Sequence, residues 1–300
     1  MSDNSLRIAF VGLGNMGGPM AINLVKAGHE VYGVDLSETA LQRHKEAGGK
    51  CAESIPEAVK DADVVITMLP AGKHVRAVYT GDEGVLTHAE RGTLLIDSST
   101  IDVDTARDVA GEAVASGMHI VDAPVSGGAV GAQAGTLTFM VGGPAEAVER
   151  ARPLLDVMGK SVVHAGDAGA GQAAKICNNM LLAISMIGTC EAFVLAEKLG
   201  LDAAKLFEVA STSSGQCWSL TSYCPVPGPV PTSPANNDYK PGFAAEMMLK
   251  DLGLARQAAE SFGAATPMGH RAAELYEQFC NQDAEKRDFS AIIHFLRQTG

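Results

Sequence analysis

The first 165 residues alternate short apolar runs with segments of helical periodicity. Two of the runs, DVVITML and TLLID, are almost continuously apolar, which is typical of parallel strands covered by helices on both faces. Helical patterns follow at 16–27 and 103–115, and Ile101 or Asp102 marks the start of the second. The alternation predicts a parallel sheet built from βαβ units. The expected strands are Leu6–Val11, Glu30–Asp35, Asp63–Leu69, Thr93–Asp97, His119–Asp122, Leu137–Gly142 and Ser161–Ala165.

The pattern changes after Gly166, and we expect no further strand. Residues 175–199 form one uninterrupted helical pattern, which would span about 37 Å at 1.5 Å per residue. Helices are also expected at 245–262 and 267–281. The proline-rich stretch 224–243 excludes a helix and is either a disordered loop or an ordered wrap over a neighbouring element. The chain therefore divides into an α/β domain at 1–165 and an all-helical domain at 166–300, joined by the long helix.

A glycine-rich segment follows the first expected strand and opens the first helix. It contains Gly12, Leu13, Gly14, Asn15, Met16 and Gly17. This G-x-G-x-x-G spacing allows a tight turn, a close approach of the backbone to a pyrophosphate, and close packing of helix against strand. Asp35 ends the next strand, 18 residues after Gly17. This is close to the separation of about 20 residues expected for an acid that binds the ribose. Strand, helix and acid in register predict a Rossmann-type dinucleotide-binding domain.

The segment GAGQAAKICNN places Lys175 and Asn179 at the head of an apolar helix. The two residues are four apart, so their side chains share one face. Burial of a lysine disfavours its charged form, and a lysine that releases its proton beside an amide is suited to proton transfer from a hydroxyl. The alternative is a lysine at a helix start with its ammonium in solvent, with asparagines that act as caps.

Polar residues also follow other strands at the sheet edge where open α/β sheets bind their ligands. Ser126, Gly127 and Gly128 form a turn whose amides could bind a carboxylate, although a plain β-turn is the simpler interpretation. The segments MLPAG and IDSST follow two further strands. Lys250 lies near the middle of a helix, where by itself it suggests an ordinary surface pair with Asp251.

Composition narrows the class of protein. Apolar residues make up 46% of the 300 residues and the net charge is −12, which favours packed domains and argues against nucleic acid or an anionic membrane as partner. The six cysteines form no C-x-x-C pair or zinc cluster, so we expect a reduced, cytoplasmic protein without a metal. The N-terminus shows no leader, and no apolar run reaches the length of a membrane span.

Taken together, these motifs resemble the β-hydroxyacid dehydrogenase family over nearly the whole chain. The resemblance rests on GLGNMGGPMAINLVKAGHEV, MLPAG, IDSST, DAPVSGG, GAGQAAKICNNML, SSGQCW and KDLGLA, in this order. It implies Lys175 as the catalytic acid/base, with Asn179 and the turn Ser126, Gly127 and Gly128 as substrate contacts. The NAD contacts that it implies are Gly12 to Gly17, Asp35, Leu69, Pro70, Thr100 and Lys250.

The resemblance is strongest to the branch that oxidises 3-hydroxyisobutyrate to methylmalonate semialdehyde in valine breakdown. Trp218 and Phe243 resemble that branch and suggest an apolar wall for a methyl group, although both could be core residues. The family also implies a homodimer or homotetramer. Two alternatives stay open: a reductase of tartronate or succinic semialdehyde, and a non-catalytic nucleotide-binding module. The presence of Lys175 speaks against the second.

Overall fold

The computed structural model describes residues 5–284 and 286–299; the first four residues of the N-terminal segment lie outside this range. The chain forms two compact units, 1–175 and 176–300. Their boundary lies ten residues beyond the predicted one at 165/166. The reason is that residues 169–172, at the start of the long helix, hydrogen-bond to the ends of two strands of the first unit.

The first unit contains a nine-stranded sheet in the order β3-β2-β1-β4-β5-β6-β8-β7, with β9 paired to β8. The strands from β3 to β6 are all parallel, in the order 3-2-1-4-5-6 of dinucleotide-binding domains. The antiparallel strand β8 joins β6 and β7. The predicted α/β class with a Rossmann-type parallel sheet is confirmed. The strands are β1 (Arg7–Val11), β2 (Glu30–Val34), β3 (Lys50–Cys51), β4 (Val64–Thr67), β5 (Leu94–Asp97), β6 (His119–Asp122), β7 (Val125–Ser126), β8 (Leu137–Gly142) and β9 (Gly159–Gly166).

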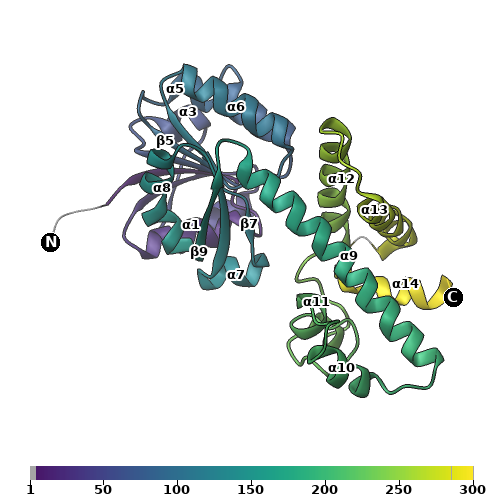
Figure 1. The fold of residues 1–300 in the computed structure, drawn as a ribbon. Helices are drawn as coiled ribbons and strands as arrows, with labels where there is room; N and C mark the ends of the chain where they lie inside the picture. Colours follow the sequence, from purple (N-terminus) through teal and green to yellow (C-terminus); the bar gives the residue numbers. More distant parts are fainter. Residues whose placement is uncertain (1–4, 285, 300) are drawn as a thin grey trace. The chain divides into compact units, whose positions relative to one another are not determined.

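Helices cover both faces of this sheet, because successive side chains of a buried strand point to opposite sides. In β1, Ile8 and Phe10 pack under α1 and α8, whereas Ala9 packs with α3 to α6 on the other face. Figure 1 shows α3, α5 and α6 on one side of the strands and α1 and α8 on the other. The helices are α1 (Gly17–Lys26), α2 (Glu38–Glu46), α3 (Ile55–Val59), α4 (Gly72–Thr80), α5 (Val85–His88), α6 (Val103–Ala115), α7 (Gly128–Ala134) and α8 (Ala145–Met158).

Local capping explains where α6 begins. Asp102 is its N-cap, and one carboxylate oxygen accepts the backbone N–H of Thr105 at 2.7 Å. An N-cap aspartate typically contributes about 1 kcal/mol. Of the two predicted start positions, Asp102 is therefore the cap.

The second unit is helical, and its described residues form no strand beyond one isolated bridge between Ala244 and Asp288. Its core gathers apolar side chains of α9, α12, α13 and α14, among them Met186, Phe193 and Tyr276. The elements that follow β9 are α9 (Ala170–Lys198), α10 (Ala203–Ser211), α11 (Trp218–Thr221), η1 (Pro234–Asn236), α12 (Ala245–Ser261), α13 (Pro267–Phe279), η2 (Cys280–Ala284), η3 (Phe289–Ala291) and α14 (Ile292–Thr299).

The proline-rich stretch is an ordered wrap rather than a disordered loop. The Ser233 hydroxyl donates to the Cys224 carbonyl at 2.6 Å, and the Tyr239 hydroxyl donates to the Pro225 carbonyl at 2.7 Å. Both donors are buried. Side chains thus replace the backbone hydrogen bonds that prolines remove.

Helix α9 is longer than predicted, at 29 residues, and is long and apolar enough to cross a membrane by length and composition. This finding corrects the expectation that no segment reaches a membrane span. The apolar composition has a structural use, because Ala183, Met186, Cys190 and Phe193 are buried in the core of the second unit. A core helix of this kind passes the same compositional test.

Candidate active site

The glycine-rich loop joins β1 to α1 with a geometry that larger residues cannot adopt. Gly12 has φ +96°, and a Cβ added there would lie 2.3 Å from the carbonyl oxygen of Met68. A Cβ on Gly17 would lie 1.9 Å from the Gly12 carbonyl oxygen. By contrast, a Cβ on Gly14 would meet nothing within 4 Å. The loop is thus tightly packed on its protein side and open at Gly14, where a pyrophosphate would approach the backbone.

The N-terminus of α1 fits an anionic ligand as well. Its N-cap residue, Met16, makes no side-chain capping bond. The first amides of a helix lack intrahelical partners and carry the positive end of the helix dipole, so they favour a phosphate. These residues fit the diphosphate of a dinucleotide.

Asp35 lies directly after β2, beside this loop. Its carboxylate accepts the backbone N–H groups of Leu13 at 2.6 Å and Ser37 at 2.7 Å. These bonds fix the carboxylate next to the glycine-rich loop. An ionised carboxylate has about four acceptor positions, so it can still accept hydrogen bonds from the hydroxyls of a ribose. The next residue, Leu36, is fully exposed.

The loops after β4 and β5 are tied to each other. The Ser99 hydroxyl accepts the backbone N–H of Leu69 at 2.9 Å, and the Thr67 hydroxyl donates to Asp97 at 2.7 Å. Burial raises the pKa of Asp97, and the hydrogen bonds from Ser99 and Thr67 oppose this shift. The predicted cofactor contacts Leu69 and Thr100 are therefore held on linked loops, with the exposed Pro70 beside them.

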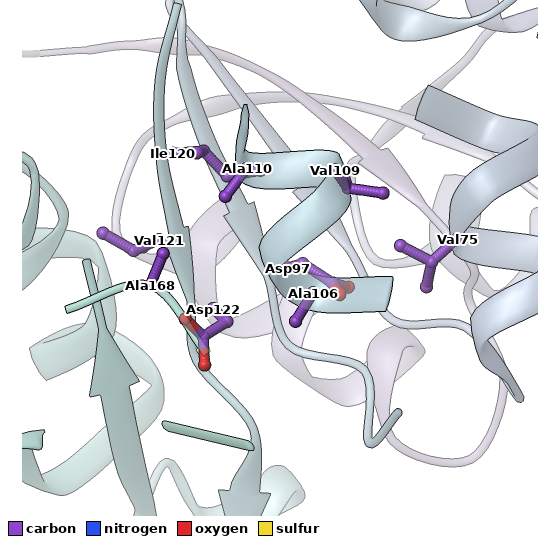
Figure 2. A pocket seen from close by; sticks show the side chains of 9 residues that line it. All are labelled: Val75, Asp97, Ala106, Val109, Ala110, Ile120, Val121, Asp122 and Ala168. Atoms are coloured by element: carbon purple, nitrogen blue, oxygen red, sulfur yellow. The ribbon is translucent and has the colours of Figure 1, made fainter. Parts of the chain in front are cut away.

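Behind this edge of the sheet, Asp97 and Asp122 line a cavity of about 10 Å³ together with apolar side chains. Figure 2 shows the two carboxylates with Val75, Val109 and Ala168 around the cavity. Substrate pockets usually enclose about 300–1,000 Å³, so this cavity is too small to be one.

The predicted carboxylate-binding turn has a different local structure from a plain β-turn. Ser126 ends the two-residue strand β7, and Gly127 is the N-cap of α7. The φ angles of Gly127 and Gly128 are +133° and +62°, values that favour glycine. No side chain caps α7, and Ser126 is partly exposed.

Lys175 lies in the second turn of α9 and is the last residue of the first unit. It is buried, with 7% of its surface exposed. Four residues later on the same helix, Asn179 is 2% exposed and belongs to the second unit. Because α9 is continuous from 170 to 198, the predicted i, i+4 relation of these two residues is present on one helix.

Within the second unit, Asn179 is held by two polar neighbours. Its Nδ2 donates to Asp251 Oδ2 at 2.5 Å, and its Oδ1 accepts from Asn178 Nδ2 at 2.9 Å. Asp251 is 3% exposed, and its other oxygen, Oδ1, accepts no hydrogen bond from the described residues. Lys250 Nζ lies 3.7 Å from that oxygen, so Lys250 and Asp251 are more than an exposed surface pair.

Trp218 and Phe243 belong to one aromatic cluster, although they do not stack on each other. Trp218 stacks on Tyr223 at a centroid distance of 4.9 Å, and Tyr223 stacks on Phe289 at 5.3 Å. Phe243 meets the edge of Phe289 at 5.7 Å. Trp218 is 52% exposed, so it offers an open aromatic face.

Sequence reasoning missed two members of this region. The Tyr223 hydroxyl donates to the buried carboxylate of Asp288 at 2.8 Å. Burial and this neighbouring carboxylate raise the pKa of Tyr223 far above its usual value, so the phenol stays protonated. The only local signal was that Asp288 precedes F-S, a pattern of a helix N-cap. Among the described residues no group of His, Cys, Asp and Glu is arranged to hold a metal ion.

Comparison with known proteins gives the family. Residues 7–166 match the family model described as the NAD binding domain of 6-phosphogluconate dehydrogenase, and residues 169–296 match the one described as NAD-binding of NADP-dependent 3-hydroxyisobutyrate dehydrogenase. A 3-hydroxyisobutyrate dehydrogenase of Pseudomonas aeruginosa is 54% identical over 97% of this chain and 98% of its own length. An NAD-dependent L-serine dehydrogenase of the same species is 50% identical over 95% of this chain and 96% of its own.

A solved structure of Mycobacterium tuberculosis 3-hydroxyisobutyrate dehydrogenase with L-serine matches at a TM-score of 0.94. It is 55% identical and covers 98% of this chain and 99% of that one. These likenesses confirm the predicted family, the enzyme class and NAD as cofactor, and they oppose a non-catalytic nucleotide-binding module. The chain belongs to the 3-hydroxyisobutyrate dehydrogenase family and is an NAD-dependent dehydrogenase.

Proposed function

We propose that this enzyme oxidises 3-hydroxyisobutyrate to methylmalonate semialdehyde, a step of valine breakdown, with Lys175 as general base. The observation that carries the proposal is the pair of buried polar residues, Lys175 and Asn179, on successive turns of α9. The 54% identity to a relative of that name supports the choice of substrate.

In this mechanism the Lys175 Nζ takes the proton of the substrate hydroxyl. When bound, NAD would supply the hydride acceptor for the carbon that carries this hydroxyl, and loss of that hydride and of the hydroxyl proton would leave a carbonyl. In the reverse direction Lys175 returns the proton to the carbonyl oxygen. Lysine suits this role because its amine can change its protonation state, which a guanidinium cannot do.

Asn179 orients the hydroxyl. An amide nitrogen has two N–H donors, and one of them is used by Asp251. The amide oxygen is used by Asn178, so the amide cannot turn over without losing both bonds. The second N–H is the group that would donate to the substrate hydroxyl oxygen. The Ser126–Gly128 segment would bind the substrate carboxylate through its hydroxyl and its amides.

The decisive experiment replaces Lys175 with alanine. Loss of a proton-transfer group typically costs about 10²–10⁴-fold in rate. We expect kcat to fall by at least about 10²-fold while the dissociation constant of NAD stays nearly constant, and Lys175→Arg should restore little. Lys198→Ala, an exposed lysine on the same helix, is the control. Normal turnover in Lys175→Ala would refute the assignment.

L-Serine is a second candidate substrate, and the carboxylate of Asp251 is the observation that favours it. Serine carries an ammonium where 3-hydroxyisobutyrate carries a methyl group. The buried Asp251 Oδ1 has Lys250 Nζ at 3.7 Å but accepts no hydrogen bond from the described part of the chain, so it could accept one from an ammonium. A 50% identical relative is named an L-serine dehydrogenase.

Kinetics with both substrates separate the two candidates. A hydrogen bond to a charged group contributes about 1.5–3 kcal/mol, or roughly 10–100-fold. If serine is the substrate, Asp251→Asn should lower kcat/KM for serine by that factor more than for 3-hydroxyisobutyrate. Equal losses for the two substrates would show that Asp251 acts only by holding Asn179. Tartronate semialdehyde and succinic semialdehyde, assayed for reduction, complete the comparison of substrates.

A further inference from the structure

Gln172 makes an unusual pair of contacts within the first unit. Its side chain is fully buried in the first turn of α9. Its Nε2 donates to the Ser99 carbonyl at 2.8 Å, and its Oε1 accepts the Ile101 backbone N–H at 3.1 Å. Ser99 and Ile101 are the two neighbours of Thr100. One amide therefore binds the backbone on both sides of a residue that the family resemblance assigns to the cofactor.

The backbone of the same helical turn is anchored to the next strand. The two oxygens of Asp122, at the end of β6, accept the N–H groups of Gly169 at 2.7 Å and of Gln172 at 2.9 Å. Asp122 thus caps α9 from a strand instead of from the residue before the helix. Figure 2 shows its carboxylate beside Ala168.

The contact between this turn and the sheet leaves no room for adjustment. A Cβ added at Gly171 would lie 2.3 Å from the Met140 carbonyl oxygen and 2.7 Å from that of Asp122. The helix start is therefore fixed by packing as well as by hydrogen bonds. The loop after β5, the end of β6 and the strand β8 together set its position.

Lys175 follows Gln172 by three residues, so the two side chains lie on neighbouring positions of one helical face. Any shift of the turn that carries Gln172 is passed to Lys175 through the rigid helix. Misplacement of a reacting group by about 1 Å can cost roughly 10²-fold in rate. Asp122 and the packing at Gly171 hold this turn against the sheet. The Gln172 amide adds the side-chain link from the turn, and so from Lys175, to the backbone on both sides of Thr100.

We propose that Gln172 is a positioning residue, which fixes Lys175 relative to the loop that contains Thr100. The inference rests on the proposed function, because it takes Lys175 as the base and Thr100 as a cofactor contact. A purely structural role would predict lower stability, and kcat would fall by the same factor whether Lys175 is present or replaced. A positioning role predicts that the effect on kcat depends on Lys175.

The experiment compares Gln172→Met, which keeps the length of the side chain without its hydrogen bonds, with the exposed control Gln257→Met. We expect kcat to fall by about 10–100-fold, with KM for 3-hydroxyisobutyrate within about threefold of wild type. In the Lys175→Ala background the same substitution should change the residual kcat by less than about twofold, because the group that it positions is gone.

A second variant guards against a failure to fold. Gln172→Glu keeps the acceptor for the Ile101 N–H but places an oxygen against the Ser99 carbonyl, and we expect the same loss of kcat. Thermal unfolding and circular dichroism confirm that each variant is folded. Unchanged kcat in a folded variant would overturn the inference. It would also be overturned if Gln172→Met lowered kcat by the same factor with Lys175 present and with Lys175 replaced by alanine. Normal activity of Lys175→Ala would instead overturn the proposed function, so the two failures are distinguishable.

Discussion

The carboxylate of Asp288 offers the sharpest test of how the second unit is held together. It is fully buried and accepts five hydrogen bonds at 2.6–3.2 Å. The donors are the Tyr223 hydroxyl, the backbone N–H groups of Gly242, Phe243 and Ser290, and the Ser290 hydroxyl. These bonds join the end of the proline-rich wrap to η3 and to the aromatic cluster. We therefore predict that Asp288→Ala is among the most destabilising single changes in the unit.

The magnitude follows from the number of donors left without a partner. A hydrogen bond to a charged group contributes about 1.5–3 kcal/mol, so simple addition would approach the whole stability of a domain. Neighbouring contributions are not additive, and removal of one partner from a buried charged network typically costs about 3–5 kcal/mol. We expect that range for Asp288→Ala. Tyr223→Phe removes one donor and should cost about 1–2 kcal/mol.

The assay uses the single tryptophan of the chain, because Trp218 stacks on Tyr223. Urea unfolding followed by its fluorescence reports directly on this cluster. Glu208→Ala is the control, since that exposed carboxylate pairs only with Lys205 among the described residues. If Asp288→Ala costs no more than Tyr223→Phe, the carboxylate does not organise the cluster and the reasoning is wrong.

Three further predictions concern cofactor, substrate and pH. Asp35→Ala should reduce the preference of kcat/KM for NAD over NADP by about tenfold or more, because it removes an acceptor for the ribose hydroxyl and a charge that repels a 2′-phosphate; a wild-type preference for NADP would contradict this. Glycerate should be at least about tenfold poorer in kcat/KM than 3-hydroxyisobutyrate, because its second hydroxyl would face the apolar wall, and 4-hydroxybutyrate should be poorer still; a better rate with either would disprove the wall. Burial lowers the pKa of His44 below the ordinary histidine value of 6.5, so its contribution to stability is complete above pH 6.5 and declines as the pH falls below it, when the unfolded chain takes up the proton first. His44→Gln should make the urea midpoint of unfolding depend less on pH between pH 8 and 5. An unchanged pH dependence of the midpoint would rule out this residue as a source of acid sensitivity.

The strands of the first unit could be predicted because they are buried on both faces and therefore appear as continuous apolar runs. Strands β3 and β7 were missed because two residues are too few to show any periodicity. The start of α9 was predicted five residues late. Glycine disfavours helix, and the cap that compensates comes from Asp122, 47 residues before Gly169.

Some residues of the candidate site could likewise be predicted from local sequence, and others could not. Residues such as Lys175 and Asn179 lie in one short segment, where spacing alone places them on one face. The pairing of Asn179 with Asp251 and of Tyr223 with Asp288 joins residues 72 and 65 positions apart. Such pairs depend on how helices pack, and no local pattern encodes them. The role proposed for Gln172 depends likewise on contacts 71 and 73 residues away.

The position of the boundary between the two units determines how the protein responds to limited proteolysis. The boundary at 175/176 falls inside the unbroken helix α9 instead of in a linker. Proteases cut segments that can unfold locally, and a hydrogen-bonded helix with buried side chains resists such opening. Cleavage at this boundary would also leave each fragment with part of a helix whose terminal amides or carbonyls have lost their partners. The two units are therefore not interchangeable modules, and limited proteolysis should release neither of them intact.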